Sequence, residues 1–370
     1  MKAQKTGLFI GGSLLACLMA GCNAAQWEME IKQALEAKGL VQNVNSQAAG
    51  EEPIVVTSIM DLRMSDLAKE ARALLAADNY VEIEKRMEQL RSKPEEFLNG
   101  DSKLIVFYGG LAGVGRNGTD ADWQKLEKRL LAWRKAQPKS VTVQVALMMT
   151  YYNGAFLARG EGYANEVTPE QGKLMAKRQE QGIKVLTSTM DAHDKCPGWH
   201  LAAQQLMFLE GVEREDYDFA VDKAVRQFPL FATDYHLRYT HYLMDRWYGE
   251  AGDWQANADK VAKAQPERKD GDILYARVLW YLIRLLDTDT APELKEFDWT
   301  RAKRGFDLLL AQPESHAVAG AFAVAAWKQR DRPTLKRLFE QQLSNHIDYG
   351  VWSSKKQFQE ARQWALGTSG

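Results

Sequence analysis

Two histidines, an aspartate and a cysteine lie within eight residues of one another, at His193, Asp194, Cys196 and His200. Imidazole nitrogens and a thiolate are ligands that Zn²⁺ accepts, so this cluster could bind the metal. However, Pro197 is typical of the first position of a helix, and the spacing fits no common zinc pattern. We therefore interpret the segment as a surface loop with a half-buried thiol that leads into a helix, and we predict no metal site.

A glycine-rich segment, Gly113-Val114-Gly115-Arg116-Asn117-Gly118, matches the G-x-G-x-x-G turn of dinucleotide-binding folds. In those folds the glycines lie at a tight turn between a strand and a helix, where backbone N–H groups reach the phosphates. Here four residues separate Gly113 from Tyr108, where the candidate strand before it ends. No acidic residue follows Val141–Val145, the next candidate strand, to bind a ribose. The pattern therefore indicates a loop between helices, and we predict no cofactor.

Two further segments combine glycine with arginine, glutamate and aromatic residues. They contribute Arg159, Glu161 and Tyr163 from the first, and Trp247, Glu250 and Trp254 from the second. Glycoside hydrolysis requires two carboxylates at a fixed separation, which Glu161 and Glu250 could supply, with Trp247 and Trp254 as platforms for the sugar rings. The same residues can instead pack between helices and close helix ends. We favour packing over a binding groove, and a binding groove over catalysis.

The segment 234–242 is dense in aromatic and basic residues. His236 and His241 are five positions apart, so they do not share one face of a helix. Other side chains are distributed around the same helix and could line a groove that binds a peptide. From this segment we take Tyr235, Arg238 and Tyr239 as candidate groove residues, together with the six from the glycine-containing segments. We recognise no catalytic constellation and therefore assign no catalytic residue.

Helices must position these residues, because apolar side chains recur at helical spacing over almost the whole chain from Asp61 onward. The stripe that ends at Leu75 and the stripe that begins at Ile83 flank an Asp78-Asn79 turn, which predicts an antiparallel helix pair. We expect further helices near residues 120–136, 140–158, 169–191, 198–210, 215–227, 232–246, 254–264, 271–287, 299–311, 315–329, 333–345 and 354–366.

Three of these helices end in a similar short sequence whose last residue is a proline, at Pro138, Pro229 and Pro313. Each proline stops one helix and sits at the start of the next. These features resemble tetratricopeptide-type repeats, although the prolines are much farther apart than the repeat of about 34 residues in that family. The resemblance implies an all-α fold in which antiparallel helix pairs stack as a degenerate tetratricopeptide-like superhelix, with residues 61–370 as one helical repeat-like domain.

Most of this region also resembles a bacterial family of uncharacterised proteins with a tetratricopeptide-like domain. The resemblance rests on the segments 151–163, 246–254 and 352–364, together with Asp298-Trp299 and Gly305-Phe306. It extends from about residue 61 to residue 366. It supports the helical fold and implies no activity and no site.

The first 21 residues have the parts of a secretory signal peptide. Lys2 and Lys5 form a positive start, and the uncharged run Leu8–Met19 is too short to span a membrane. The segment 18–22, Leu-Met-Ala-Gly-Cys, resembles the lipobox of bacterial lipoproteins, with Met where Leu is usual. The resemblance implies that residues 1–21 are removed and that Cys22 carries the lipid. A cleaved signal with a chance cysteine is the alternative.

Asn23 follows the expected lipidation site. In lipoproteins of this type an aspartate at that position resembles a signal for retention at the inner membrane, so the asparagine favours the outer membrane and its periplasmic face. Residues 22–60 then contain a short amphipathic pattern at 24–38 and an aperiodic stretch at 39–57. This stretch is either a linker that holds the body away from the membrane or a loop packed on the domain, and the sequence leaves both open.

Charge and cysteine content restrict the function. The net charge of −1 offers no concentrated basic face, so we predict no binding to nucleic acid. After export and lipidation Cys196 would be the remaining cysteine, so the fold depends on its core and not on a disulfide. The sequence thus predicts a lipid-anchored helical scaffold that binds an unknown protein, peptide or envelope polymer in a concave groove. The alternative is an envelope hydrolase that cleaves glycan.

Overall fold

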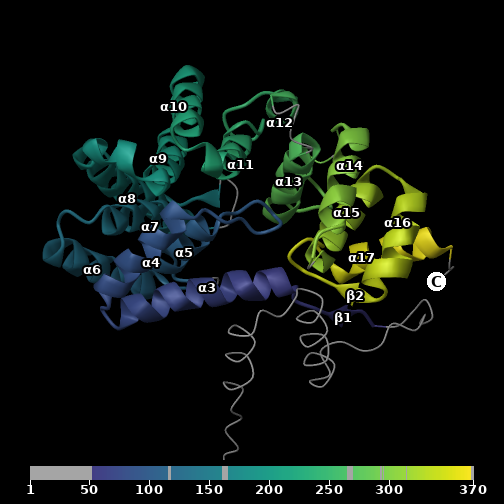
Figure 1. The fold of residues 1–370 in the computed structure, drawn as a ribbon, viewed down its shortest axis with the longest axis horizontal. Coiled ribbons are helices and arrows are strands. Elements are labelled where there is room, and N and C mark those ends of the chain that lie inside the picture. The colour runs from purple at the N-terminus through teal and green to yellow at the C-terminus, as the bar shows by residue number, and fades with distance from the viewer. Residues whose placement is uncertain are drawn as a thin grey trace, which may run out of the picture.

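A computed structural model describes residues 52–115, 118–160, 166–264, 270–291, 294, 296–313 and 315–367. The side chains of residues 193, 194 and 270 are not described. The expected signal peptide, Cys22, Glu161 and Tyr163 lie outside the described residues, so the predictions made for them stay predictions. Figure 1 shows that the described chain is almost entirely helical, which confirms the all-α fold class.

The helices occur along the chain in the following order: α3 (Ile59–Ala76), α4 (Tyr80–Ser92), α5 (Lys103–Ala112), α6 (Asp120–Ala136), α7 (Val141–Arg159), α8 (Pro169–Ser188), α9 (Pro197–Glu210), α10 (Arg214–Gln227), α11 (Ala232–Tyr242), α12 (Asp253–Lys263), α13 (Asp270–Leu285), α14 (Trp299–Leu310), α15 (His316–Lys328), α16 (Arg332–Leu338) and α17 (Lys355–Leu366). Shorter elements are the 3₁₀ turns η2 (Met190–Lys195) and η3 (Pro229–Phe231), the π-helical turn η5 (Phe339–Leu343), and the strands β1 (Ile54–Val55) and β2 (His346–Ile347).

Local capping explains where many helices begin. Ser58, Ser102 and Ser140 each accept a hydrogen bond from the backbone N–H three residues further on, at the starts of α3, α5 and α7. Thr119 and Thr168 form complete capping boxes at α6 and α8. Such caps satisfy N–H groups that the first turn of a helix leaves without a partner.

The segment 103–112, in which the sequence offered a candidate strand, is the buried helix α5. Val141–Val145, the other candidate strand, begins α7. The glycine-rich segment therefore connects two helices, α5 and α6, as the loop interpretation predicts. The expected helix at 333–345 is shorter than predicted, because α16 passes into the π-helical turn η5 and then into β2.

The helices pack in a regular order. Helices α5, α7, α9, α11, α13 and α15 each contact the next member of that series. The helices between them cover this series: α6 packs on α7, α8 on α7 and α9, α10 on α9 and α11, α12 on α11 and α13, and α14 on α13 and α15. From α5 to α15, every second helix thus belongs to one packed row. Figure 1 shows this row running from the blue N-terminal helices to the yellow-green C-terminal helices.

Helix α3 joins the two hydrophobic clusters of the core. Leu67, Ala71 and Leu75 belong to the cluster formed by the N-terminal helices, whereas Met60 belongs to the cluster formed by the C-terminal helices. Arg284 of α13 forms an ion pair of 2.9 Å with Asp61. In Figure 1, α3 accordingly runs along one side of the molecule, in contact with α4 and α5 at one end and with α15 at the other.

The residues before α3 pack against the C-terminal part of the chain. Strand β1 lies parallel to β2, and the Ile54 and Val56 N–H groups donate to the Asn345 and Ile347 carbonyls at 2.9 and 3.0 Å. Lys355 also forms an ion pair with Glu52. The end of the stretch 39–57, from residue 52 onward, is therefore a packed segment, and in Figure 1 the purple β1 lies beside the yellow β2.

Candidate ligand-binding cleft

An open cleft of about 520 Å³ lies between α10, α11 and α12. Helix α11 forms its floor, and α10 and α12 form its walls. The lining residues are Arg214, Asp218, Val221, Asp222 and Val225 of α10, Ala232, His236 and Tyr239 of α11, and Asp253, Ala256, Asn257, Lys260, Val261 and the adjoining Ala264 of α12. Within each helix these residues recur at intervals of three or four, so that one face of each helix is turned to the cleft.

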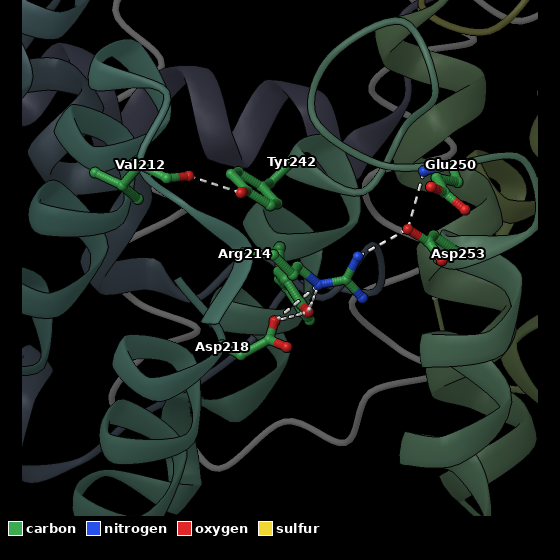
Figure 2. Close-up of polar contacts among 7 residues, drawn as sticks. Val212, Arg214, Asp218, Tyr242, Glu250 and Asp253 are labelled. Carbon is green, nitrogen blue, oxygen red and sulfur yellow. Dashed lines mark hydrogen bonds and ion pairs between the residues drawn. The ribbon is translucent and has the colours of Figure 1, made fainter. Parts of the chain in front are cut away.

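Arg214 holds the two walls together at one end of the cleft (Figure 2). Its Nε lies 3.1 Å from Asp218 Oδ1 on α10, and its Nη1 lies 2.7 Å from Asp253 Oδ2 on α12. Nε also donates to the Tyr239 hydroxyl on the floor at 3.0 Å, and that hydroxyl donates to Asp218. One guanidinium therefore links all three helices.

Asp253 is fixed from two sides. Its Oδ2 accepts the Glu250 N–H at 2.9 Å in addition to the Arg214 guanidinium. Burial opposes ionisation of this carboxyl, but the two donors outweigh burial and lower its pKa. The Tyr239 hydroxyl shows the opposite change, because burial and the neighbouring Asp218 carboxylate both raise its pKa. Arg214 thus faces the ionised Asp253 and a neutral phenol.

His236 lies at the middle of the floor and is 9% exposed. Its Nδ1 has no hydrogen-bond partner among the described residues. Burial lowers its pKa to about 4, an effect that Asp222 opposes and Lys260 increases. The imidazole is therefore neutral near pH 7, with one nitrogen able to donate and the other able to accept a hydrogen bond.

Two charged side chains of opposite sign flank this histidine. Asp222 on α10 and Lys260 on α12 line the cleft and are exposed. Within the part of the chain that the structure describes, neither forms an ion pair. The Nδ2 of Asn257, one turn before Lys260, is also buried without a hydrogen-bond partner among the described residues. The middle of the cleft thus contains several polar groups that a ligand could satisfy.

The candidate groove residues of the segment 234–242 fall in different places. Tyr235 is fully buried, and its hydroxyl donates to the Pro197 carbonyl at 3.1 Å. Arg238 is tied to Asp101 at 3.2 Å. Tyr239 lines the cleft, but its ring is 6% exposed. Tyr235 is therefore part of the core, Arg238 is engaged by an ion pair, and Tyr239 contributes mainly its hydroxyl.

The residues of the second glycine-containing segment behave mostly as the packing interpretation predicts. Trp254 is 2% exposed, and Trp247 packs edge-on against Phe208 at 4.8 Å between ring centres. Glu250 contributes its backbone N–H to the Asp253 interaction, and Figure 2 shows it at the rim of the Arg214 network. In the first segment, Arg159 Nη1 donates to the Gly160 carbonyl at 3.3 Å at the end of α7. The structure does not bring Arg159 to this cleft, and Glu161 and Tyr163 lie outside the described residues.

The cysteine–histidine cluster spans the 3₁₀ turn η2 and the start of α9. Cys196 is 1% exposed, and its Sγ lies 3.7 Å from the Tyr108 hydroxyl in the core. The half-buried thiol expected from the sequence is thus a fully buried one. His200 is also buried, and its Nε2 lies 3.2 Å from Gln227 Oε1. Among the described residues no group of histidine, cysteine and acidic side chains is arranged to hold a metal ion.

Comparison with known proteins adds no assignment. No protein-family model matches the chain, and no curated protein and no solved structure matches it. Within the described part of the chain, none of the helices combines the length and apolar character needed to cross a bilayer.

Proposed function

We propose that this protein is a lipid-anchored binding protein of the bacterial cell envelope, whose helical body holds a small ligand or short peptide in the cleft between α10, α11 and α12. The cleft is the observation that carries this proposal. Its volume of about 520 Å³ is in the range of small-molecule and peptide sites. Its lining combines six apolar side chains with eight polar or charged ones, so it offers a ligand both apolar contacts and hydrogen bonds.

Buried polar groups without partners are the second support. Leaving such a group without a hydrogen bond costs roughly 1–3 kcal/mol, so a partner for the nitrogens of His236 and Asn257 would be stabilising. A ligand that offers them partners recovers part of this cost on binding. A cleft with this composition therefore favours ligand binding over a purely structural role.

The regular helix order supports the finer architectural proposal of a degenerate tetratricopeptide-like superhelix. Helices from α5 to α15 form one packed row and are covered by the helices between them. Stacked helix pairs commonly bind peptides on the surface that the stacking creates. The cleft opens between two of the covering helices, α10 and α12, with α11 of the packed row beneath them.

The lipobox-like segment that ends in Cys22 supports attachment to the membrane, and we propose the periplasmic face of the outer membrane as its location. The alternative function, a glycan-cleaving hydrolase, gains no support from the cleft. Trp254, a proposed sugar platform, is enclosed in the core. Membrane fractionation tests the anchor: the wild-type protein is expected in the membrane fraction and Cys22→Ser in the soluble fraction.

Binding is tested with a variant that fills the cleft. Ala256 is exposed and lines the cleft, so Ala256→Trp should obstruct it, whereas Ala73→Trp places the same side chain on the exposed face of α3. Each purified protein is incubated with the low-molecular-weight fraction of a bacterial envelope extract, washed and denatured. Mass spectrometry of the released molecules should detect a compound with the wild-type protein and Ala73→Trp that is missing with Ala256→Trp. Equal release by all three proteins would reject the proposal.

A further inference from the structure

The charges of the cleft are not all available to a ligand. Arg214 is already compensated by Asp218 and Asp253 at 3.1 and 2.7 Å, so these three side chains serve mainly to fix the walls. Asp222 and Lys260 remain, and neither forms an ion pair within the described residues. They belong to opposite walls, and both act electrostatically on His236 between them. The cleft thus presents one negative and one positive group across a polar floor.

The nitrogens between these charges fit an amide group. A neutral imidazole has one donor and one acceptor, and the Asn257 Nδ2 is a donor. Both His236 Nδ1 and Asn257 Nδ2 are buried and without partners among the described residues. A peptide group supplies one N–H donor and one C=O acceptor, and can therefore satisfy both kinds of nitrogen. Hydroxyl groups could do the same, so the charges and the shape must distinguish a peptide from a sugar.

Sugars are disfavoured by the position of the aromatic ring. A sugar ring typically stacks on the accessible face of an aromatic side chain. In this cleft the lining contributes Tyr239 for that purpose. Its ring is 6% exposed and stacks on Tyr217, with 5.8 Å between ring centres and 16° between ring planes. The face needed by a sugar is therefore occupied inside the protein.

Ligands of a single charge are also disfavoured. Three carboxylates line the cleft, on Asp218, Asp222 and Asp253, against the two cations Arg214 and Lys260. An anion without a positive group would be repelled by this excess of carboxylates, and a cation without a negative group would leave Lys260 without a partner. Beyond these charges, the lining includes the apolar side chains of Val225, Val261 and Ala264.

We infer that the cleft binds a short peptide with a free amino end and a free carboxyl end. Asp222 receives the ammonium group, Lys260 receives the carboxylate, and His236 with Asn257 hydrogen-bonds to the peptide groups between them. Small aliphatic side chains of the peptide pack against the valines of the walls. This inference rests on the proposed binding function and deepens it by naming the class of ligand.

The test is a calorimetric titration of the purified full chain with tri-alanine, N-acetyl-tri-alanine and tri-alanine amide, with chitotriose and succinate as non-peptide probes. Tri-alanine is expected to bind. Acetylation removes the ammonium and amidation removes the carboxylate, so each should weaken binding about tenfold, as the loss of one charge-assisted contact would.

Two cleft variants show which wall recognises which end. Asp222→Asn should bind the acetylated and the unmodified peptide equally well, and Lys260→Gln should bind the amide and the unmodified peptide equally well. The matched controls are Asp216→Asn and Lys263→Gln, which remove exposed charges from the same two helices outside the cleft lining. Both controls should discriminate between the peptides as the wild-type protein does.

Several results would overturn the inference. These are a failure of tri-alanine to bind, equal binding of all three peptides to the wild-type protein, and cleft variants that both discriminate between the peptides as the wild-type protein does. If chitotriose or succinate binds instead and Ala256→Trp abolishes that binding, the ligand class is wrong while the binding function stands. If Ala256→Trp also releases the same envelope compounds as the wild-type protein, the binding function itself is wrong.

Discussion

At the scale of single residues, Arg214 is the side chain on which the shape of the cleft depends most. Its guanidinium reaches a carboxylate on each wall and a hydroxyl on the floor. The sequence did not single it out, because Arg214, Asp218 and Asp222 at intervals of four look like the solvated face of an amphipathic helix. Their partner Asp253 lies on another helix, so no local pattern reveals the contact.

Replacing Arg214 tests this role. Arg214→Gln should lower the free energy of unfolding by about 1 kcal/mol, a modest loss because the side chain is 38% exposed and its ion pairs are screened by solvent. Arg226→Gln removes an exposed arginine from the last turn of the same helix and should change stability little. Urea denaturation measures both. Equal losses in the two variants would show that Arg214 does not hold the walls.

One buried and one half-buried histidine, His236 and His241, make stability depend on pH. Burial lowers the pKa of His236 and of His241 to about 4, from an ordinary value of 6.5. The unfolded chain therefore binds protons that the folded chain refuses between these values, and the free energy of unfolding falls as the pH falls from 6.5 to 4. Each histidine contributes at most about 3 kcal/mol to this loss. Asp234 acts in the opposite direction, because burial raises its pKa to about 7.

The contribution of the two histidines is obtained by comparing the wild-type protein with a variant that lacks both. Asp234 is common to the wild-type protein and to the double variant His236→Gln/His241→Gln, so its contribution cancels when their pH profiles are subtracted. Between pH 7 and pH 4 the wild-type protein should lose more stability than the variant, as measured by urea denaturation at each pH. Parallel profiles would mean that the two imidazoles titrate normally in the folded state.

The candidate groove residues show what a single helix pattern can and cannot reveal. Most of the segment 234–242 is buried, and Tyr239 does line the cleft. The pattern could not show that Arg238 faces Asp101, which lies on a distant loop. Nor could it mark His236 as the floor of a cleft, because the walls come from helices before and after α11.

At the scale of elements, most helices were predictable because their apolar residues follow helical spacing and their ends carry caps or prolines. Helix α5 was not, since nearly every residue from Leu104 to Ala112 is apolar and most are buried. A helix enclosed on almost every side has no polar face and therefore no periodicity to detect. Its two adjacent glycines, Gly109 and Gly110, also have a low helix propensity.

The same pair of glycines provides a test of helix packing. A Cβ on Gly110 would collide with the Ala68 carbonyl oxygen and lie 2.7 Å from the Ala71 Cβ where α5 crosses α3. Gly110→Ala should therefore destabilise the protein by about 1–3 kcal/mol. At Gly109 nothing lies within 4 Å, so Gly109→Ala should stabilise the helix by roughly 0.5–1 kcal/mol. Thermal denaturation should give shifts of opposite sign, and shifts of the same sign would contradict the close crossing.

At the scale of the whole molecule, α3 and β1 connect the beginning of the described chain to its end. The contacts that these two elements make with the C-terminal part could not be predicted from the sequence. Strand β1 has only two residues and pairs with a strand nearly 300 positions away. The choice between a free linker and a packed loop was open for the same reason. The pairing of β1 with β2 and the packing of Met60 in the C-terminal core cluster join the N-terminal end of the described chain to its C-terminal part.

Proline substitution tests this closure. Ile54 donates its N–H to the Asn345 carbonyl, and Ile54→Pro removes that donor. Val55→Pro is the matched control, since the two donors to the β2 segment are Ile54 and Val56 and the Val55 side chain is exposed. Hydrogen–deuterium exchange at β2 and α17 should be faster in Ile54→Pro than in Val55→Pro. Equal exchange would show that β1 does not stabilise the C-terminal helices.

We propose that this protein holds a short peptide in the cleft between α10, α11 and α12. Methyl NMR of valine-labelled protein titrated with tri-alanine tests this proposal. The methyl signals of Val221, Val225 and Val261, which line the cleft, should shift, while those of Val143 and Val324 in the core should stay in place. Unmoved signals from the three cleft valines at saturating peptide would contradict it.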